Sequence, residues 1–182
     1  MSRSVAFTKE SFDQQNSESG AFLPTENDLS CLSEPVIVQE KTIPNRVVYQ
    51  AMEGCDGTSD GKPGELTKRR YIRFASGGAG VIWFEATACC FEGRANPRQL
   101  WMCEENVEAF HLLLDAIRSA SLKENGTVPL IIMQNTHSGR YAKPHGFPEP
   151  LIAYHNPLFE KDDPISPKRV YLMINLTVYA TI

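Results

Sequence analysis

Three polar side chains at the end of an apolar run could do chemistry together: Gln134, His137 and Arg140. The Gln134 amide can both donate and accept hydrogen bonds, the His137 imidazole can exchange a proton near neutral pH, and the Arg140 guanidinium can bind an anion. Each also has a purely structural interpretation. Gln134 could be a buried amide satisfied by backbone, His137 could orient a loop, and Arg140 could pair with a surface carboxylate.

Two further pairs follow the earlier apolar runs of the sequence. Glu53 and Asp56 could form an acid and base pair, but without a known separation we interpret them as solvated loop residues. Cys89 and Cys90 could form a redox pair, although a vicinal pair is more often two small buried residues. Neither pair alone predicts a catalytic site.

Short β-rich runs must position these residues. We expect strands at residues 36–38, 46–52, 80–86 and 128–134, with a turn around Pro44 over residues 41–45. We expect helices over residues 65–76, ended by Gly77 and Gly78, and over residues 104–123. The first run and its neighbour predict a β-hairpin that precedes the alternating elements.

Apolar spacing predicts which residues form the core. The second helix carries a stripe at steps of three and four, made of Val107, Phe110, Leu114 and Ile117. The run 80–86 is apolar on both faces, so we expect Trp83 and Phe84 to be core residues. The residues 1–30 are polar and predict a loosely packed arm.

Strands that alternate with helices predict parallel strands and an α/β fold. The long loops follow the strands, as they do in a (β/α)8 barrel, where these loops build the active site. A doubly wound sheet is the alternative, but no GxGxxG follows any expected strand.

Composition excludes several classes of partner and site. The chain has 182 residues, 42% hydrophobic and 22% charged, and a net charge of −4, so no basic field is available to bind nucleic acid. The five cysteines include no CxxC pair, which favours neither a zinc site nor a disulfide framework. The first residues lack the apolar segment of a secretory signal, so we expect a cytoplasmic protein without membrane contact.

Four blocks of sequence occur in a consistent order over residues 35–157. They are Asn45-Arg46-Val47-Val48 with Met52, the run Tyr71 to Gly80 followed by Glu85-Ala86-Thr87, then Glu92-Gly93-Arg94, and finally Gln134 to Arg140. Together they resemble the N-terminal part of the Old Yellow Enzyme family of FMN-dependent oxidoreductases. The segments Met52 to Gly57 and His137 to Tyr141 are most similar to its branch of NADH:flavin oxidoreductases and 2,4-dienoyl-CoA reductases.

The resemblance implies an incomplete TIM barrel, with about its first three βα units, that binds FMN at the carboxyl ends of its strands. It implies NADH or NADPH as the hydride donor and an enone or enoyl compound as the small-molecule substrate of the complete enzyme. The cofactor-binding positions that it implies are Ala51, Met52, Glu53, Ala86, Gln134, His137 and Arg140. It assigns no catalytic residue and no metal ligand within this chain.

Individual roles follow from the same resemblance. Ala51 and Met52 would contact the flavin through backbone, Ala86 would leave room for its ring, and Gln134 would hydrogen-bond its pyrimidine edge. Glu53 stands where relatives have Thr or Cys, and a charged carboxylate there would disfavour an anionic reduced flavin unless it is protonated or turned away.

The sequence departs from the family pattern at three places. Ala51 replaces a proline, Asn135 replaces an apolar residue, and the apolar tail after residue 164 resembles nothing in the family. We therefore divide the chain into a polar arm (1–34), the N-terminal part of an FMN-binding barrel domain (35–164) and the tail (165–182). The family's substrate-anchoring His/His or His/Asn pair and its tyrosine would lie beyond the resemblance, so enzyme activity of this chain alone stays undecided.

Three functional hypotheses remain open. The chain could be the N-terminal portion of a flavin oxidoreductase, truncated before its catalytic residues. It could be a non-catalytic flavin binder or a half-barrel that self-associates through open sheet edges. It could also be a non-functional remnant, because a part-barrel leaves much of its inner face uncovered.

Overall fold

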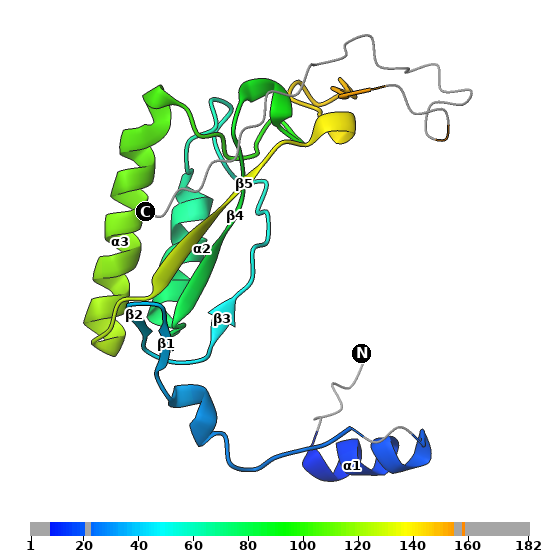
Figure 1. Ribbon diagram of the computed structural model, residues 1–182, viewed down its shortest axis with the longest axis vertical. Coiled ribbons are helices and arrows are strands. Elements are labelled where there is room, and N and C mark those ends of the chain that lie inside the picture. The colour runs from blue at the N-terminus through cyan, green and yellow to red at the C-terminus, as the bar shows by residue number, and fades with distance from the viewer. Residues whose placement is uncertain (1–7, 21–22, 155–157, 159–182) are drawn as a thin grey trace, which may run out of the picture. The chain divides into compact units, whose positions relative to one another are not determined.

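The computed structural model describes residues 8–20, 23–154 and 158, and the chain divides into two compact units, residues 1–31 and 32–182. The first unit contains helix α1, Lys9–Glu18 (Figure 1). Thr8 caps it, since its hydroxyl accepts a hydrogen bond from the Ser11 N–H at 3.2 Å and its own N–H donates to the Ser11 hydroxyl. None of the helix is buried, and this helix was missing from the predicted arm.

The second unit begins with a 3-10 turn, Ser30–Ser33, that crosses the boundary, and with a β-hairpin. Strand β1, Val36–Val38, pairs antiparallel with β2, Lys41–Ile43. The predicted turn over residues 41–45 is therefore wrong, because the chain reverses earlier, at Gln39, whose φ of 54° permits a tight turn. The hairpin itself was predicted, but with the wrong second strand.

Three parallel strands form the sheet that carries the site, in the order β3-β4-β5. They are β3 (Val48–Tyr49), β4 (Val81–Ala88) and β5 (Leu130–Thr136). The predicted strand over 46–52 is reduced to two residues, whereas the predictions for the other two strands end two residues too early. The residues after Tyr49 leave the ladder because they form a loop that is fastened to other elements.

Helices α2, Glu65–Ser76, and α3, Val107–Asn125, pack against one face of this sheet (Figure 1). Helix α2 ends at Ser76 and is capped by Gly77, as predicted, and Gly78 then adopts a φ of +82°. Helix α3 starts later than predicted, after a 3-10 turn at Glu104–Asn106. Its first stripe residue, Val107, is 40% exposed, so the prediction for that residue is wrong.

The hydrophobic core lies between these helices and the sheet. Tyr71 stacks on Phe84 with ring centroids 4.1 Å apart, and Phe110 packs against the same ring. The buried members of the cluster are Tyr71, Ala75, Ala79, Ile82, Phe84, Leu100, Phe110, Leu113 and Ile117. Burying side chains of this size contributes about 1.5–3 kcal/mol each, which makes this layer the main source of stability.

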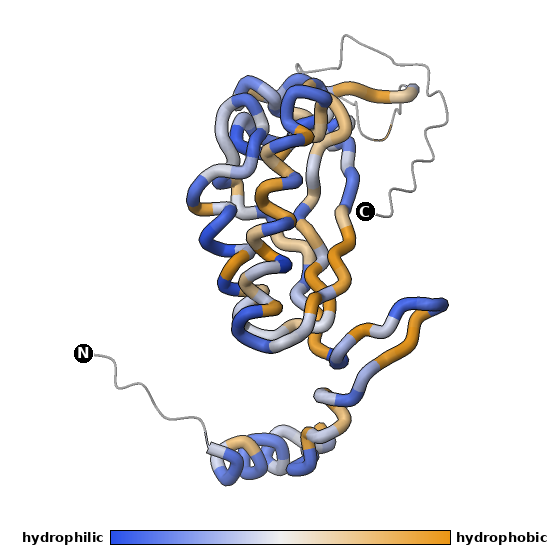
Figure 2. The backbone as a smooth tube through the Cα atoms, turned by 90° about the vertical axis from the view of Figure 1, so that its left-hand side faces the viewer, coloured by the Kyte–Doolittle hydropathy of each residue, from blue (hydrophilic) through white to orange (hydrophobic). Residues whose placement is uncertain are grey.

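The opposite face of the sheet is open within the described residues. Trp83 pairs in register with Ile132 on this face and is 41% exposed, although the sequence predicted it as core. Its neighbour Phe84 is buried, because successive side chains of a strand point to opposite faces and both helices lie on one of them. Val48 on β3 is also exposed, and Figure 2 shows the apolar character of the strands beside the helices.

The fold is thus a partial α/β arrangement with an open parallel sheet, as the alternation predicted. No helix in the described ranges combines the length and apolarity needed to cross a membrane.

Candidate functional site

A β-bulge lies where β4 and β5 approach their carboxyl ends. Phe84 is in register with Met133 and Thr87 with Asn135, so two residues of β4, Glu85 and Ala86, stand opposite Gln134. The bulge turns Glu85 toward α2: Phe84 and Glu85 are consecutive yet both only 1% exposed. Bulges often re-aim side chains beside binding sites.

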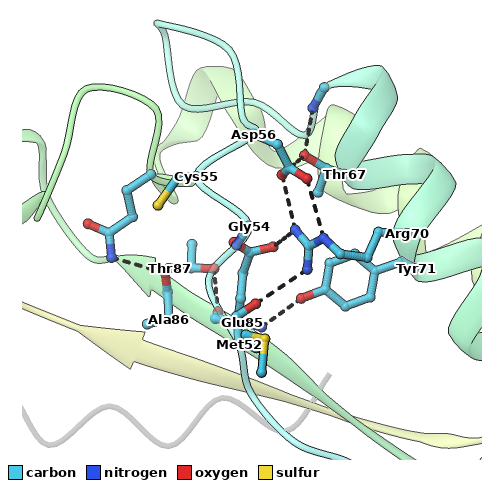
Figure 3. A network of polar contacts seen from close by, with 12 residues as sticks. Met52, Gly54, Cys55, Asp56, Thr67, Arg70, Tyr71, Glu85, Ala86 and Thr87 are labelled. Atoms are coloured by element: carbon cyan, nitrogen blue, oxygen red, sulfur yellow. Dashed lines mark hydrogen bonds and ion pairs between the residues drawn. The ribbon is translucent and has the colours of Figure 1, made fainter. Parts of the chain in front are cut away.

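The carboxylate that the bulge re-aims meets an arginine of α2 (Figure 3). Arg70 holds Asp56 through two hydrogen bonds, Nη2 to Oδ1 at 3.0 Å and Nε to Oδ2 at 3.3 Å. The same Nη2 donates to Glu85 Oε1 at 2.5 Å. One guanidinium thus links the loop after β3, helix α2 and the end of β4.

Two neighbouring hydroxyls complete this network (Figure 3). Thr67 donates to Asp56 Oδ1 at 2.6 Å, and the Gly64 N–H donates to the Thr67 hydroxyl at 3.2 Å. The Glu85 N–H donates to the Tyr71 hydroxyl at 2.7 Å. Burial, followed by the nearby Glu85 carboxylate, raises the pKa of Tyr71, so its hydroxyl stays neutral.

The carboxylates near the loop differ in charge preference. Burial alone would raise the pKa of Asp56, but the hydrogen bonds from Arg70 and Thr67 outweigh it, so the pKa of Asp56 is lowered. Glu53 is exposed by surface area, yet neighbouring atoms partly desolvate its carboxylate, and this desolvation together with repulsion from Glu85 raises the pKa of Glu53. Asp56 is therefore part of an ion pair, and the interpretation of both residues as solvated loop carboxylates is wrong for it.

A second arginine fastens the loop after β4. Arg94 is 1% exposed, and its guanidinium donates to the carbonyls of Ser59, Pro97 and Gln99, with the Ser59 contact at 2.9 Å. Burial lowers its pKa. Gln99 in turn donates to the Ala86 carbonyl at 3.0 Å, so the loop is tied to the bulge.

The predicted cofactor positions surround the carboxyl ends of the three strands. Met52 is 73% exposed, Gln134 is exposed, and Ala86 is half-buried beside it in the bulge. Ala51 is half-buried and Glu53 exposed, with Glu53 Oε1 accepting from Gln99 at 3.4 Å.

His137 and Arg140 lie on the segment that follows β5. The His137 Nδ1 accepts a hydrogen bond from the Gly139 N–H at 3.0 Å, which orients the loop and leaves Nε2 as the protonated nitrogen of a neutral ring. Its ring lies against Gly93, where an added Cβ would come within 2.9 Å of His137 Cδ2. Arg140 is half-buried in the 3-10 turn Gly139–Tyr141.

The vicinal cysteines differ in exposure. Cys89 is exposed and Cys90 half-buried, so the expectation of two buried residues is wrong for Cys89. Burial and the adjacent Cys89 raise the pKa of Cys90 to about 11. A thiol with a raised pKa is a poor nucleophile at neutral pH.

Sequence reasoning missed the residues that fasten the site. Arg70 and Arg94 received no role, although Glu85 carried a signal as the single charged residue of the strand Val81–Ala88. A carboxylate in a buried strand requires a cation partner, and Thr67 and Arg70 lie three apart on one helix face.

The carboxyl ends of the strands carry polar groups that can form hydrogen bonds. The described residues contain no group of three or more His, Cys, Asp or Glu side chains that could hold a metal ion. Ala86 and the exposed Gln134 lie at the carboxyl ends of adjacent parallel strands, and Met52 lies in the loop that follows β3. Open α/β sheets bind ligands at this end.

No family model matches the sequence. An NADPH dehydrogenase of Bacillus subtilis (strain 168) is 33% identical over 119 residues, which are 63% of this chain and 32% of the relative. An NADPH dehydrogenase of Geobacillus sp. (strain WCH70) is 34% identical over 118 residues, 63% of this chain and 32% of the relative. The chain thus spans about a third of the length of these curated relatives.

Solved structures agree with the sequence relatives. The Old Yellow Enzyme homologue from Zymomonas mobilis matches with a TM-score of 0.57 and 26% identity, over 69% of this chain and 33% of that one. The Old Yellow Enzyme from Trypanosoma cruzi matches in fold with a TM-score of 0.56 and 21% identity, over 74% of this chain and 37% of that one.

Proposed function

Since the chain is similar in sequence and fold to the N-terminal part of the Old Yellow Enzyme family of flavin oxidoreductases, we propose that it supplies the first part of an FMN site. In the whole protein, this site would serve NADH- or NADPH-driven reduction of an activated alkene, an enone or enoyl compound. The described strands β3, β4 and β5 would be the first three strands of the barrel, after the hairpin.

The observation that carries the proposal is the bulge at Ala86 opposite the exposed Gln134. It brings a small residue and an amide side by side at the carboxyl end of the sheet. A flavin presents a flat ring and a pyrimidine edge that both donates and accepts hydrogen bonds, and a single amide can satisfy both. The residues present therefore fit the cofactor.

Each residue has a role that its position permits. Gln134 would hydrogen-bond the pyrimidine edge, Ala86 would leave room for the ring, and the Ala51 and Met52 backbone would line one side. His137 and Arg140 follow the same strand end and would orient the segment and bind negative charge. FMN would supply the hydride transfer, and these residues would place it and exclude water.

Glu53 contributes a carboxyl group beside the proposed flavin site. Its raised pKa favours the neutral carboxyl more than in a free side chain, which lessens the repulsion of an anionic ligand. Asp56 and Glu85 remain paired to Arg70, so their charges are compensated.

The test is an FMN titration of the purified chain, followed by quenching of flavin fluorescence. We expect saturable one-to-one binding that weakens about tenfold on Gln134→Ala, the equivalent of about 1.4 kcal/mol. Asn135→Ala, the exposed neighbour on the same strand, is the matched control and should leave the Kd unchanged. A folded chain that does not bind FMN would overturn the proposal for this chain.

A second candidate is a non-catalytic half-barrel that associates with a second copy. The open sheet face with Val48 and Trp83 favours it, together with the unpaired outer edges that β3 and β5 have in the described part of the chain. Sedimentation velocity over a wide concentration range tests it, and a monomer at every concentration would exclude it.

A further inference from the structure

The segment Met52–Asp56 has no regular secondary structure, yet both ends and its middle are held (Figure 3). The Met52 carbonyl accepts from Arg70 Nη1 at 3.3 Å, and the Gly54 N–H donates to Glu85 Oε2 at 2.9 Å. The Asp56 carboxylate closes the segment through Arg70 and Thr67. The name Arg70 clasp is used below for Arg70, Glu85, Asp56 and Thr67.

Arg70 is the common partner of these contacts. Its guanidinium reaches Met52, Asp56 and Glu85 at once, which requires several donors in a fixed plane. Its side chain is 22% exposed, and it lies over the Tyr71 ring with Cζ 4.9 Å from the centroid. A lysine could keep the charge, but it could not make this set of hydrogen bonds.

The backbone of Gly54 lies directly against the clasp. A Cβ added at Gly54 would come within 2.2 Å of Arg70 Nη2 and within 2.7 Å of Asp56 Oδ2. Only glycine allows this approach without displacing the guanidinium. The contact therefore gives a second way to disturb the clasp, one that keeps every charge.

The clasp holds a conformation that a free segment would rarely adopt. Cys55 has a φ of 47°, in the left-handed region that costs a non-glycine residue of order 1 kcal/mol or more. Such a conformation persists only where the surrounding structure fixes it. The contacts on each side of Cys55, at Gly54 and Asp56, supply that constraint.

We propose that Arg70 is a positioning residue that holds the segment Met52–Asp56 in its ligand-receiving conformation before FMN binds. This inference rests on the proposed flavin site, because the segment lines that site through Met52 and Glu53. Arg70 acts through the segment, and ordering it in advance removes an entropic cost that binding would otherwise incur.

The first measurement is hydrogen exchange of the peptide that covers residues 52–57 in the flavin-free chain. In Arg70→Lys we expect exchange at the Gly54 amide to be about tenfold faster, because its acceptor Glu85 loses its fixed position. Gly54→Ala should give the same change without altering charge. Arg69→Lys, an exposed neighbour on α2, should match the unchanged chain.

The second measurement is FMN affinity of the same variants at a temperature at which circular dichroism shows all of them folded. We expect Arg70→Lys and Gly54→Ala to weaken binding about tenfold, mainly through a slower association rate, and Arg69→Lys to leave it unchanged. A general loss of stability would not change the association rate of fully folded protein.

The outcomes separate the two proposals. Unchanged exchange in both Arg70→Lys and Gly54→Ala would overturn the clasp. Faster exchange with unchanged FMN affinity would overturn its role in positioning for flavin. If the unchanged chain does not bind FMN, the proposed function fails, and the exchange comparison alone decides whether Arg70 holds the segment.

Discussion

The two faces of the sheet differ in how complete they are. The face under α2 and α3 is packed by a closed cluster of aromatic and aliphatic side chains, and the loops at its carboxyl end are fastened by two arginines. The opposite face leaves Trp83 and Val48 exposed in the described residues. Within the described residues, the same strands thus have one face that is covered by helices and one face that is not.

The difference teaches that the geometry at the carboxyl ends of the strands does not depend on a cover over the open face. The bulge at Glu85 and Ala86, the Arg70 clasp and the Arg94 contacts use only residues between Met52 and Asn135. Any cover of the open face would come from atoms outside the described residues, and the chain spans about a third of its relatives' length. The proposed flavin site would therefore be formed whether or not the open face is covered.

The largest effect that tests this contrast comes from adjacent residues on β4. Phe84→Ala should destabilise the fold by about 3–4 kcal/mol, because it removes a ring stacked on Tyr71 and leaves a cavity. Trp83→Ser should cost less, about 2 kcal/mol, since 41% of its surface stays exposed to water. Urea denaturation measures both, and equal costs would show that the open face is covered in solution.

Arg94→Met should have the next largest effect, about 2 kcal/mol, because it removes the hydrogen-bond donors of three carbonyls, one of which is buried. Those carbonyls belong to Ser59, Pro97 and Gln99, so two loops would loosen together. Arg98→Met, at an exposed position of the same loop, is the control and should change stability by less than about 0.5 kcal/mol. Similar losses of stability in both variants would mean that the hydrogen bonds of the Arg94 guanidinium make no specific contribution to the free energy of unfolding.

The elements of the covered face could be predicted from sequence, because local spacing determines them. Helix α2 was predicted to the residue, since its glycine stop is explicit, and the α/β order followed from alternation. The exposure of Trp83 could not be predicted, because an apolar run does not reveal how many layers cover it. The position of the tight turn at Gln39 was hidden for a different reason, since glutamine rarely adopts a positive φ.

For the candidate site, the sequence predicted which residues take part but not the hydrogen bonds and ion pairs that hold them in place. Gln134 and Ala86 were expected at strand ends by resemblance, yet their juxtaposition depends on the bulge, which shifts the register by one residue. Arg70 was missed because its two carboxylate partners, Asp56 and Glu85, lie 14 and 15 residues away along the chain. Long-range ion pairs of this kind leave only an indirect sign, here a lone charge within an apolar strand.

A smaller effect, on acid stability, tests the fastened end. The pKa of Asp56 is lowered in the folded chain, so the ionised carboxylate contributes stability above its unfolded pKa of about 3.9 and loses it as pH falls through the folded value. Asp56→Asn should therefore cost about 1–2 kcal/mol at neutral pH, and this difference should vanish in acid. Urea titrations from pH 7 to pH 2 measure it, because the loss begins only below the unfolded pKa of about 3.9 and is complete below the folded pKa.

Asp115→Asn is the matched control for that experiment. Asp115 forms an exposed pair with Arg118 at 3.6 Å, and exposed pairs contribute little. Its stability should equal that of the unchanged chain, within about 0.5 kcal/mol, at every pH. A cost for Asp56→Asn that stays constant into acid would show that hydrogen bonding, rather than the charge of the Arg70 clasp, stabilises this end.

The last prediction concerns self-association and tests the open face most directly. It compares the self-association constant of Trp83→Ser with that of the unchanged chain. If the face is covered by a second copy, removing its largest exposed ring should weaken association by about tenfold while the monomer stays folded. Leu112→Ser removes an apolar side chain that is exposed on α3, and it controls for non-specific association through apolar surface. Sedimentation velocity of both variants would distinguish the cases. Loss of association on Trp83→Ser alone would show that the sheet face is the contact. Equal loss in both variants would assign the association to non-specific apolar contacts. The open sheet face would then not be the contact between copies.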